Sequence, residues 1–218
     1  MSGWLELLPS RYAFVERFNH RSVTKLPAEP ARMTTLEIGA GTGAHVAFED
    51  LTRQDYHCLE LRPEFCSRLR SLPGVVSVTA GSIEEPTGFT SAGFDRVIAI
   101  HVLEHLRNLP AALQEVDRVL KPAGIFDVVL PCEGGLAYSL ARKISAQRYF
   151  ERRFGMSYTP IIRNEHVSTF AEIRVELDQR FTVTSERFFP IPVPFVPLNL
   201  CVALRLRKRD AAPSAGSA

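Results

Sequence analysis

The sequence lacks the features that mark several classes of protein. Its 218 residues carry 26 basic and 24 acidic side chains, so the net charge is only +2 and general nucleic-acid binding is not expected. No apolar run approaches the roughly 18–20 residues of a membrane span. The first residues, MSGWLELLPSR, have no basic segment followed by an apolar core, so no signal peptide is expected. These absences favour a cytoplasmic protein.

Cysteine is sparse as well. The chain has 4 cysteines, none in a C-x-x-C pair, at positions 58, 66, 132 and 201. Scattered cysteines of this kind are typical of reduced thiols in the cytoplasm rather than of a disulfide framework or a zinc site. With 45% hydrophobic and 23% charged residues, the composition is that of an ordinary globular protein of about one domain.

Apolar segments and helical patterns alternate along the chain. Strands are expected at residues 34–38, 56–61, 75–80, 94–100, 125–130, 180–188 and 199–207, and helices at residues 4–20, 44–53, 63–72, 110–120 and 169–180. This order predicts an α/β fold with a parallel sheet and helices on both faces. For the last of the helices, Ser168 or Thr169 is expected to be the N-cap, with Glu172 near the third position.

The segment TLEIGAGTGAHV, residues 35–46, joins the first strand to the next element through three glycines, Gly39, Gly41 and Gly43. Glycine permits positive φ and a close approach of the backbone to a ligand. The segment also satisfies the dinucleotide pattern G-x-G-x-x-G/A, and Glu60 follows about 20 residues later, where an acid binds ribose hydroxyls. A nicotinamide cofactor is therefore one interpretation of this turn.

Glu37 favours another ligand. A pyrophosphate prefers a helix N-terminus without nearby acids, whereas an acid two residues before the first glycine suits a cation. The segment LEIGAGTG resembles the first motif of the class I S-adenosylmethionine-dependent methyltransferases. The segments FDRVIAIHVLEHL and EVDRVLKPAGIFDVVLP resemble later motifs of the same superfamily, in the same order, particularly in its small-molecule branch.

The resemblance implies a Rossmann-like, seven-stranded, mostly parallel sheet whose last strand runs antiparallel beside the fifth. It further implies one methyltransferase domain over residues 1–208. The tail at 209–218 has no apolar content to bury and is expected to be disordered. Within this domain we expect a helical cap at 1–33, a cofactor-binding core at 34–131, a lid or substrate insertion at 132–168, and the end of the sheet at 169–208.

The resemblance also implies roles for individual residues around S-adenosylmethionine. The glycine turn would lie under its methionine part, Glu37 would face its amino end, and Glu60, followed by Leu61, would accept the ribose hydroxyls. Ser82 stands where the family often has an acid that binds the adenine amine, so the adenine contact is left open. The full set of expected cofactor residues is Glu37, Gly39, Ala40, Gly41, Gly43, Glu60, Leu61, Ser82, Ile83 and His101.

Two histidines are candidates for catalysis. His105 lies in HVLEHL and His166 in NEHVSTF, and an imidazole can accept a proton near neutral pH. The alternative for Glu104 and His105 is to form and hydrogen-bond the wall of the site. No metal site is expected, because the pattern is not H-E-x-x-H and no third ligand is evident.

Residues 136–163 form the most individual part of the chain. They hold six basic residues, Arg142, Lys143, Arg148, Arg152, Arg153 and Arg163, against one acid, Glu151. Leu136, Leu140 and Ile144 recur every four residues, as on an amphipathic helix. The segment is either a solvated basic face, a lid that selects an anionic acceptor by charge, or a peripheral contact with an anionic membrane.

We therefore expect methyl transfer from S-adenosylmethionine to a small-molecule or lipid-like acceptor, with an anionic acceptor as one alternative, and no nucleic-acid partner. Two alternatives stay open. One is a nicotinamide-dependent oxidoreductase that uses the same glycine turn, and the other is a cofactor-binding protein without transfer activity. The acceptor atom and the oligomeric state do not follow from the sequence.

Overall fold

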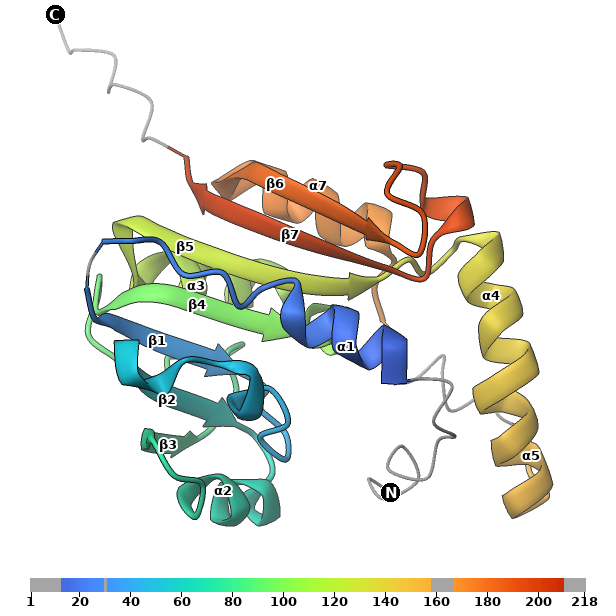
Figure 1. Ribbon diagram of the computed structural model, residues 1–218, viewed down its shortest axis with the longest axis horizontal. Helices are drawn as coiled ribbons and strands as arrows, with labels where there is room; N and C mark the ends of the chain where they lie inside the picture. The colour runs from blue at the N-terminus through green and yellow to red at the C-terminus, as the bar shows by residue number, and fades with distance from the viewer. Residues whose placement is uncertain (1–12, 30, 158–166, 210–218) are drawn as a thin grey trace, which may run out of the picture.

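A single seven-stranded sheet organises the computed structural model, which describes residues 13–29, 31–157 and 167–209 (Figure 1). The strand order is β3-β2-β1-β4-β5-β7-β6. The strands are β1 Met33–Ile38, β2 Gln54–Glu60, β3 Val75–Ala80, β4 Phe94–Ile100, β5 Leu120–Pro131, β6 Phe181–Phe189 and β7 Cys201–Lys208. The ladders from β3 to β5 are parallel, and β7 runs antiparallel to both of its neighbours. The Rossmann-like sheet with an antiparallel last strand is thus confirmed.

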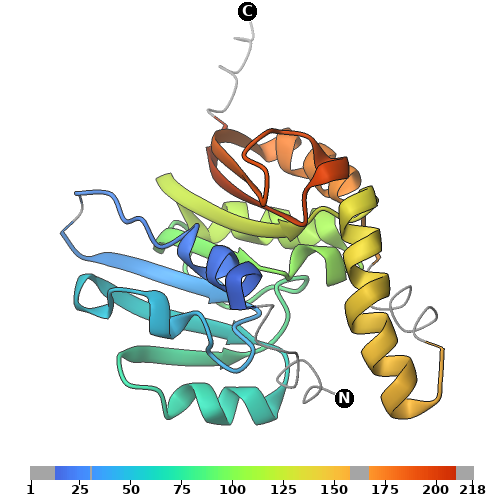
Figure 2. The same ribbon diagram turned by 45° about the vertical axis from the view of Figure 1, so that its right-hand side comes forward.

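Helices cover both faces of the sheet. They are α1 Ala13–Arg21, α2 Pro63–Arg70, α3 Leu109–Val119, α4 Leu136–Arg142, α5 Arg148–Phe154 and α7 Phe170–Arg180. The larger apolar core lies on the face covered by α3 and α7, and a smaller one lies on the opposite face under α1 and α2. Helices α4 and α5 stand beyond the carboxyl ends of the strands, joined by a π-helical turn at Lys143–Gln147 (Figure 2).

The ends of the helices have local causes. Thr169 caps α7, since its side chain accepts the N–H of Glu172 while Glu172 accepts the N–H of Thr169, which completes a capping box. The expected helix start at this point is confirmed. Asn108 caps α3 in a similar way and is followed by Pro110 in the first turn.

The helix expected at residues 44–53 is wrong. This stretch forms two short 3₁₀ turns, Val46–Phe48 and Leu51–Arg53. Asp50 separates them, because its carboxylate accepts hydrogen bonds from the N–H and hydroxyl of Thr52 and starts a new turn. The break lets Glu49 point into the protein, where its side chain is fully buried.

Several expectations fall on residues outside the described ranges. These include the part of the first helix before residue 13, His166 and Arg163 in the insertion, and the tail from residue 210 onward. Among the described residues, no helix combines the length and apolar character needed to cross a bilayer.

Candidate functional site

The glycine turn lies at the carboxyl end of β1, next to β4, where the strand order reverses. Ligands of open α/β sheets bind at this position. Gly39, Gly41 and Gly43 all have positive φ, at 62°, 54° and 80°. The N–H of Gly39 bonds to the carbonyl of Leu59 at 2.8 Å, which ties the start of the turn to β2.

The three glycines serve different purposes. A Cβ at Gly39 would lie 2.6 Å from the Val102 side chain, and one at Gly43 would lie 2.3 Å from Leu72, so both permit close packing of the turn. A Cβ at Gly41 would meet nothing nearer than the Gly39 carbonyl at 4.0 Å. Gly41 therefore opens onto free space, as a cradle for a ligand requires.

Glu60, the last residue of β2, is fixed against this turn. Its Oε2 accepts the N–H of Gly41 at 2.8 Å, and its Oε1 accepts the N–H of Arg62 at 2.8 Å. Each oxygen of a carboxylate can accept a second hydrogen bond, so both remain able to bind hydroxyl groups. The turn and the acid that would hold a ribose are thus one preorganised unit.

Glu37, on β1, is buried beneath the turn. Its Oε2 accepts the hydroxyl of Tyr56 at 2.9 Å. Burial raises the pKa of Glu37 to about 7, although His45 and Tyr56 act in the opposite direction. This carboxyl therefore holds a proton more readily than an exposed acid, and a cation that binds beside it would favour its ionised form.

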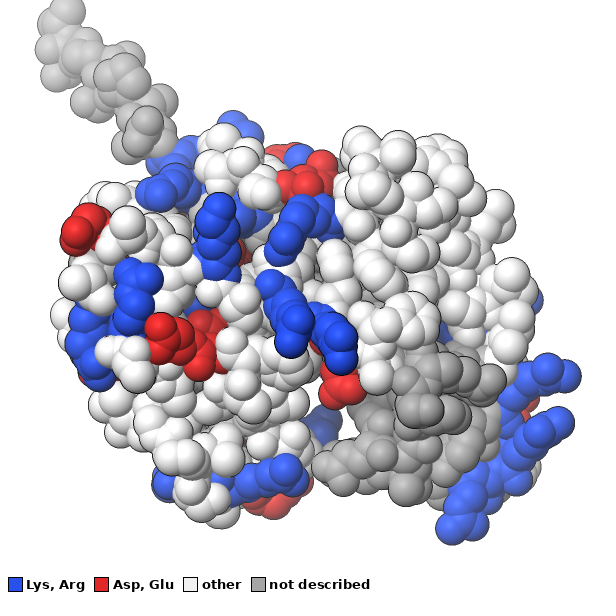
Figure 3. All heavy atoms as spheres, in the orientation of Figure 1, with Lys and Arg blue, Asp and Glu red and all other residues white. Residues whose placement is uncertain are grey.

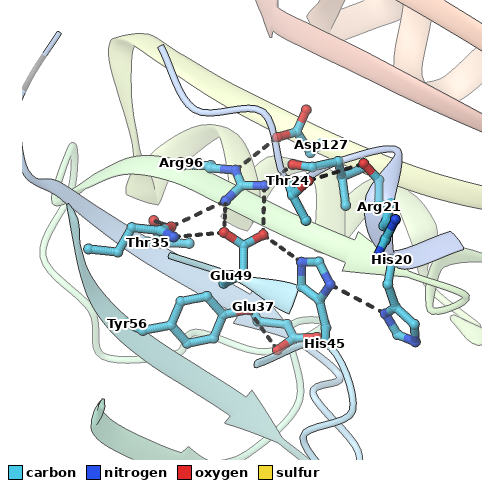
Figure 4. A network of polar contacts seen from close by, with 12 residues as sticks. His20, Arg21, Thr24, Thr35, Glu37, His45, Glu49, Tyr56, Arg96 and Asp127 are labelled. Carbon is cyan, nitrogen blue, oxygen red and sulfur yellow. Dashed lines mark hydrogen bonds and ion pairs between the residues drawn. The ribbon is translucent and has the colours of Figure 1, made fainter. Parts of the chain in front are cut away.

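Beside Glu37, a network of buried charges joins β4 and β5 to the segment that carries Glu49 (Figure 4). Arg96, on β4, donates through Nε to Asp127 at 2.8 Å and through both Nη atoms to Glu49 at 2.9 and 3.1 Å. Arg205, on β7, donates two more hydrogen bonds to Asp127. Arg96 also bonds to the carbonyl of Val23, so the network holds the segment after α1 against the sheet.

Two histidines connect the network to α1. His45 Nε2 lies 2.7 Å from Glu49 Oε1, and His45 Nδ1 lies 3.3 Å from His20 Nδ1. The ring of His20 stacks on Phe48 with a centroid distance of 4.8 Å. Burial, together with His45 and His101, lowers the pKa of His20 to about 4, so this histidine is neutral at physiological pH.

His101 and Glu104 form a second polar pair, just after β4. His101 has a left-handed backbone, with φ of 53°, and its Nδ1 lies 3.1 Å from Glu104 Oε1. Burial opposes the charge on His101, but hydrogen bonds to Cys201 and Glu104 outweigh it and raise the pKa to about 10. Glu104 Oε2 is buried and has no hydrogen-bond partner within the described residues. The carboxyl ends of the parallel strands form one edge of the sheet, which we call the ligand edge. A strained backbone and a buried carboxylate at this edge are typical of a functional position.

The other expected residues are dispersed around the edge. Ser82 accepts the N–H of Glu84, which shapes the turn after β3, while Ile83 is buried in the core beneath it. Leu61 is exposed beside Glu60, and Ala40 is buried within the glycine turn. His105 is exposed at the end of the 3₁₀ turn Leu103–His105, in which Glu104 points inward to His101.

The sequence reasoning missed the network around Arg96 and the pairing of Glu104. A signal for the network was present, because Arg96 and Asp127 interrupt otherwise apolar strands. A charge in a buried strand requires a partner. Glu49 lies in a stretch that the sequence predicts as a regular helix, so nothing in the sequence indicates that its side chain is buried.

Comparison with known proteins agrees with this geometry. A family model described as a methyltransferase domain matches residues 36–128. Over these residues the chain is similar to methyltransferases, in agreement with the predicted resemblance to the class I S-adenosylmethionine-dependent superfamily. It is similar over 92% of its length, with a TM-score of 0.60 and 19% identity, to 83% of a Burkholderia thailandensis 1,6-didemethyltoxoflavin N1-methyltransferase, a structure with bound S-adenosylhomocysteine. A likeness at this identity supports the fold of the methyltransferase domain.

Two curated relatives are similar over shorter stretches. A probable phthiotriol/phenolphthiotriol dimycocerosates methyltransferase of Mycobacterium ulcerans is 30% identical over 118 residues, which are 52% of this chain and 45% of the relative. A phthiotriol/phenolphthiotriol dimycocerosates methyltransferase of Mycobacterium leprae is 32% identical over 108 residues, 48% of this chain and 39% of the relative. The chain thus matches less than half the length of these methyltransferases.

Proposed function

We propose that this chain transfers a methyl group from S-adenosylmethionine to a lipid-like or small-molecule acceptor. The observation that carries the proposal is the contact between Glu60 and the N–H of Gly41, at 2.8 Å, inside a methyltransferase domain. The lipid-like acceptor is suggested by the two mycobacterial relatives, which are named for dimycocerosates.

The residues of the edge fit this cofactor. The open side of Gly41 would receive its methionine part, Glu60 would accept the ribose hydroxyls, and Glu37 would face its positive end. The cofactor supplies a methyl group already activated by the sulfonium, so the protein's main contribution is to position the acceptor in a dry site. For the adenine contact, Ser82 and Glu84 lie together at the end of β3, with Ser82 as its proposed centre.

On the acceptor side, His101 would line the path between the methyl donor and the acceptor. A base is needed only where the acceptor must lose a proton, and His105 and His166 are the proposed candidates. We further propose an acceptor with an anionic end, reached by peripheral contact with a membrane. Arg142 on α4 is a cation near the site, where it pairs with Glu133 at 2.9 Å and lies 5.8 Å from the centre of the Tyr138 ring.

Calorimetry with S-adenosylmethionine, S-adenosylhomocysteine and NADH tests the cofactor. The two sulfur compounds should bind with micromolar Kd values, which correspond to a binding free energy of about 8 kcal/mol. Glu60→Ala should weaken both by roughly 1.5–3 kcal/mol, because charged hydrogen bonds are lost. Glu64→Ala, an exposed acid on α2, serves as the matched control and should change nothing.

Binding of NADH without binding of either sulfur compound would establish the oxidoreductase alternative instead. Transfer itself is measured with a methyl-labelled donor and a lipid extract. Cofactor binding without any labelled product from lipid or aqueous extracts would favour the non-catalytic alternative.

A further inference from the structure

Helix α4 exposes its apolar side to solvent, whereas an ordinary surface helix buries that side. Its leucines and the isoleucine that follows in the π-helical turn lie mostly in solvent, with Leu136 76%, Leu140 59% and Ile144 52% exposed. The residues on its other side, Tyr138 and Arg142, are partly buried. Amphipathic helices bury their apolar stripe against the core, so a stripe that faces outward has an external partner.

A second apolar feature lies directly beside this stripe. The segment between β6 and β7, residues 190–200, exposes Ile191, Val193 and Phe195, which alternate with prolines. Its backbone packs against the start of α4, because a Cβ at Gly135 would lie 2.6 Å from the carbonyl oxygen of Val196. Figures 1 and 2 both show this segment next to the top of α4. The two features therefore form one continuous apolar surface.

The backbone of this segment has few N–H groups left for water. Proline contributes none, and it occupies positions 190, 192, 194 and 197. The N–H of Ile191 bonds to the side chain of Asn199 at 2.8 Å, and the N–H groups of Val193 and Phe195 bond to carbonyls within the segment. Asn199 is fully buried and also donates to the carbonyls of Val193 and Phe195. A loop with so few unpaired backbone donors can enter an apolar medium at low cost.

Basic side chains follow this apolar surface along the π-helical turn and α5. Lys143, Arg148, Arg152 and Arg153 are exposed. In Figure 3 the uncharged surface covers the upper right, over α4 and the segment between β6 and β7, and Lys and Arg side chains project below it over α5. An apolar surface bordered by cations matches the interface of a bilayer with anionic headgroups.

We propose that this surface, made of the outer side of α4, the segment 190–198 and the basic side chains of residues 143–153, binds an anionic lipid bilayer. The proposal deepens the proposed function, because it names the membrane as the place where a lipid-like acceptor is met. Since α4 stands beyond the carboxyl ends of the strands, docking on this surface places the ligand edge next to the lipid.

Vesicle co-sedimentation of the full chain, without cofactor or acceptor, tests this surface. The vesicles contain phosphatidylcholine alone or equal parts of phosphatidylcholine and phosphatidylglycerol. The chain should bind the anionic vesicles and bind the neutral ones much less. Arg148→Glu with Arg152→Glu should reduce binding roughly tenfold to hundredfold and remove most of its salt dependence.

The apolar part has its own pair of variants. Leu140→Ser with Phe195→Ser should reduce binding to anionic vesicles by at least about tenfold, because two large apolar side chains no longer enter the interface. The matched controls carry the same changes elsewhere: Val175→Ser with Val76→Ser for exposed apolar residues, and Arg68→Glu with Arg70→Glu for charge. Both control variants should leave binding unchanged.

Equal binding by the wild type and both surface variants, or no binding of the wild type to anionic vesicles, overturns the proposal. So does light scattering that shows a dimer which Leu140→Ser with Phe195→Ser makes monomeric, because the surface would then be covered by a second copy. Vesicle binding without cofactor binding would contradict the methyl-transfer proposal alone. Methyl transfer by a chain that does not bind vesicles would contradict the membrane-binding proposal alone.

Discussion

Consecutive residues of the same strands meet opposite environments on the two faces of the sheet. On the face covered by α3 and α7, Leu36 and Phe126 belong to an apolar core. On the other face, the neighbouring residues Glu37 and Asp127 are equally buried but charged or titratable. An apolar face needs only shape and area to be stable, whereas a charged face needs every partner in place. The second face is the one that supports the glycine turn, so structural precision is concentrated where the cofactor would bind.

The largest expected effect comes from breaking the charged face. Arg96→Ala would leave Glu49 and Asp127 buried without their shared cation, so the free energy of unfolding should fall by about 3–5 kcal/mol. Leu36→Ala, one strand away on the apolar face, should cost about 2–5 kcal/mol by opening a cavity. Denaturant unfolding of both variants gives the comparison.

The two losses should differ in how they can be recovered. Replacing Arg96, Glu49 and Asp127 together by Met, Gln and Leu removes the charges that Arg96→Ala leaves unpaired, although Arg205 loses its hydrogen bonds to Asp127, and should restore part of the stability. A loss below about 1 kcal/mol for Arg96→Ala would mean that water or Arg205 compensates the carboxylates and that the network is not a stabilising unit.

The same contrast explains what the sequence could predict. Six of the seven strands begin within two residues of the predicted start, because apolar runs such as residues 94–100 are typical of buried strands. The fifth strand begins at Leu120, five residues before the predicted start. The glycine turn and Glu60 were recognised because their roles depend on local backbone chemistry. The segment 44–53 was misassigned, since the burial of Glu49 depends on Arg96, which is distant in sequence. The exposure of the apolar side of α4 could not be predicted from the sequence either. The periodicity of apolar residues gives their spacing on a helix but not whether that side faces the core or the solvent.

A second prediction separates ligand space from backbone strain. Gly41→Val and Gly88→Val both place a branched residue at positive φ, and in both cases a Cβ would meet no close neighbour. Each should lower stability by roughly 1–2 kcal/mol. Only Gly41→Val should also weaken S-adenosylmethionine binding, by at least about a hundredfold in calorimetry, because its side chain would fill the cradle. Normal binding by this variant would show that the turn is structural and that the site lies elsewhere.

The smallest expected effect concerns Glu37, whose carboxylate has no cationic hydrogen-bond partner within the described residues. Its pKa is 4.5 in the unfolded chain and about 7 in the folded one, so the folded state holds its proton more tightly. The stability due to this proton is fully present below pH 4.5 and is lost as the pH rises through about 7. Glu37→Gln cannot lose a proton, so at pH 8 it should be about 1–3 kcal/mol more stable relative to wild type than it is at pH 4.5.

This comparison isolates Glu37, because other groups of the network titrate in both proteins. His20 contributes stability that is lost as the pH falls from 6.5 through about 4, and Glu49 contributes stability that is lost as the pH falls from 4.5 through about 2. Denaturant unfolding across pH 4.5–8 measures the difference, with Glu64→Gln as an exposed control that should follow the wild type. The stabilised Glu37→Gln variant should nevertheless bind S-adenosylmethionine more weakly, since a neutral amide no longer attracts the positive end of the cofactor. If the variant gains stability at high pH and keeps full affinity, Glu37 supports only the packing beneath the turn. If it gains stability but loses affinity, the buried acid lowers the stability of the fold and contributes to cofactor binding.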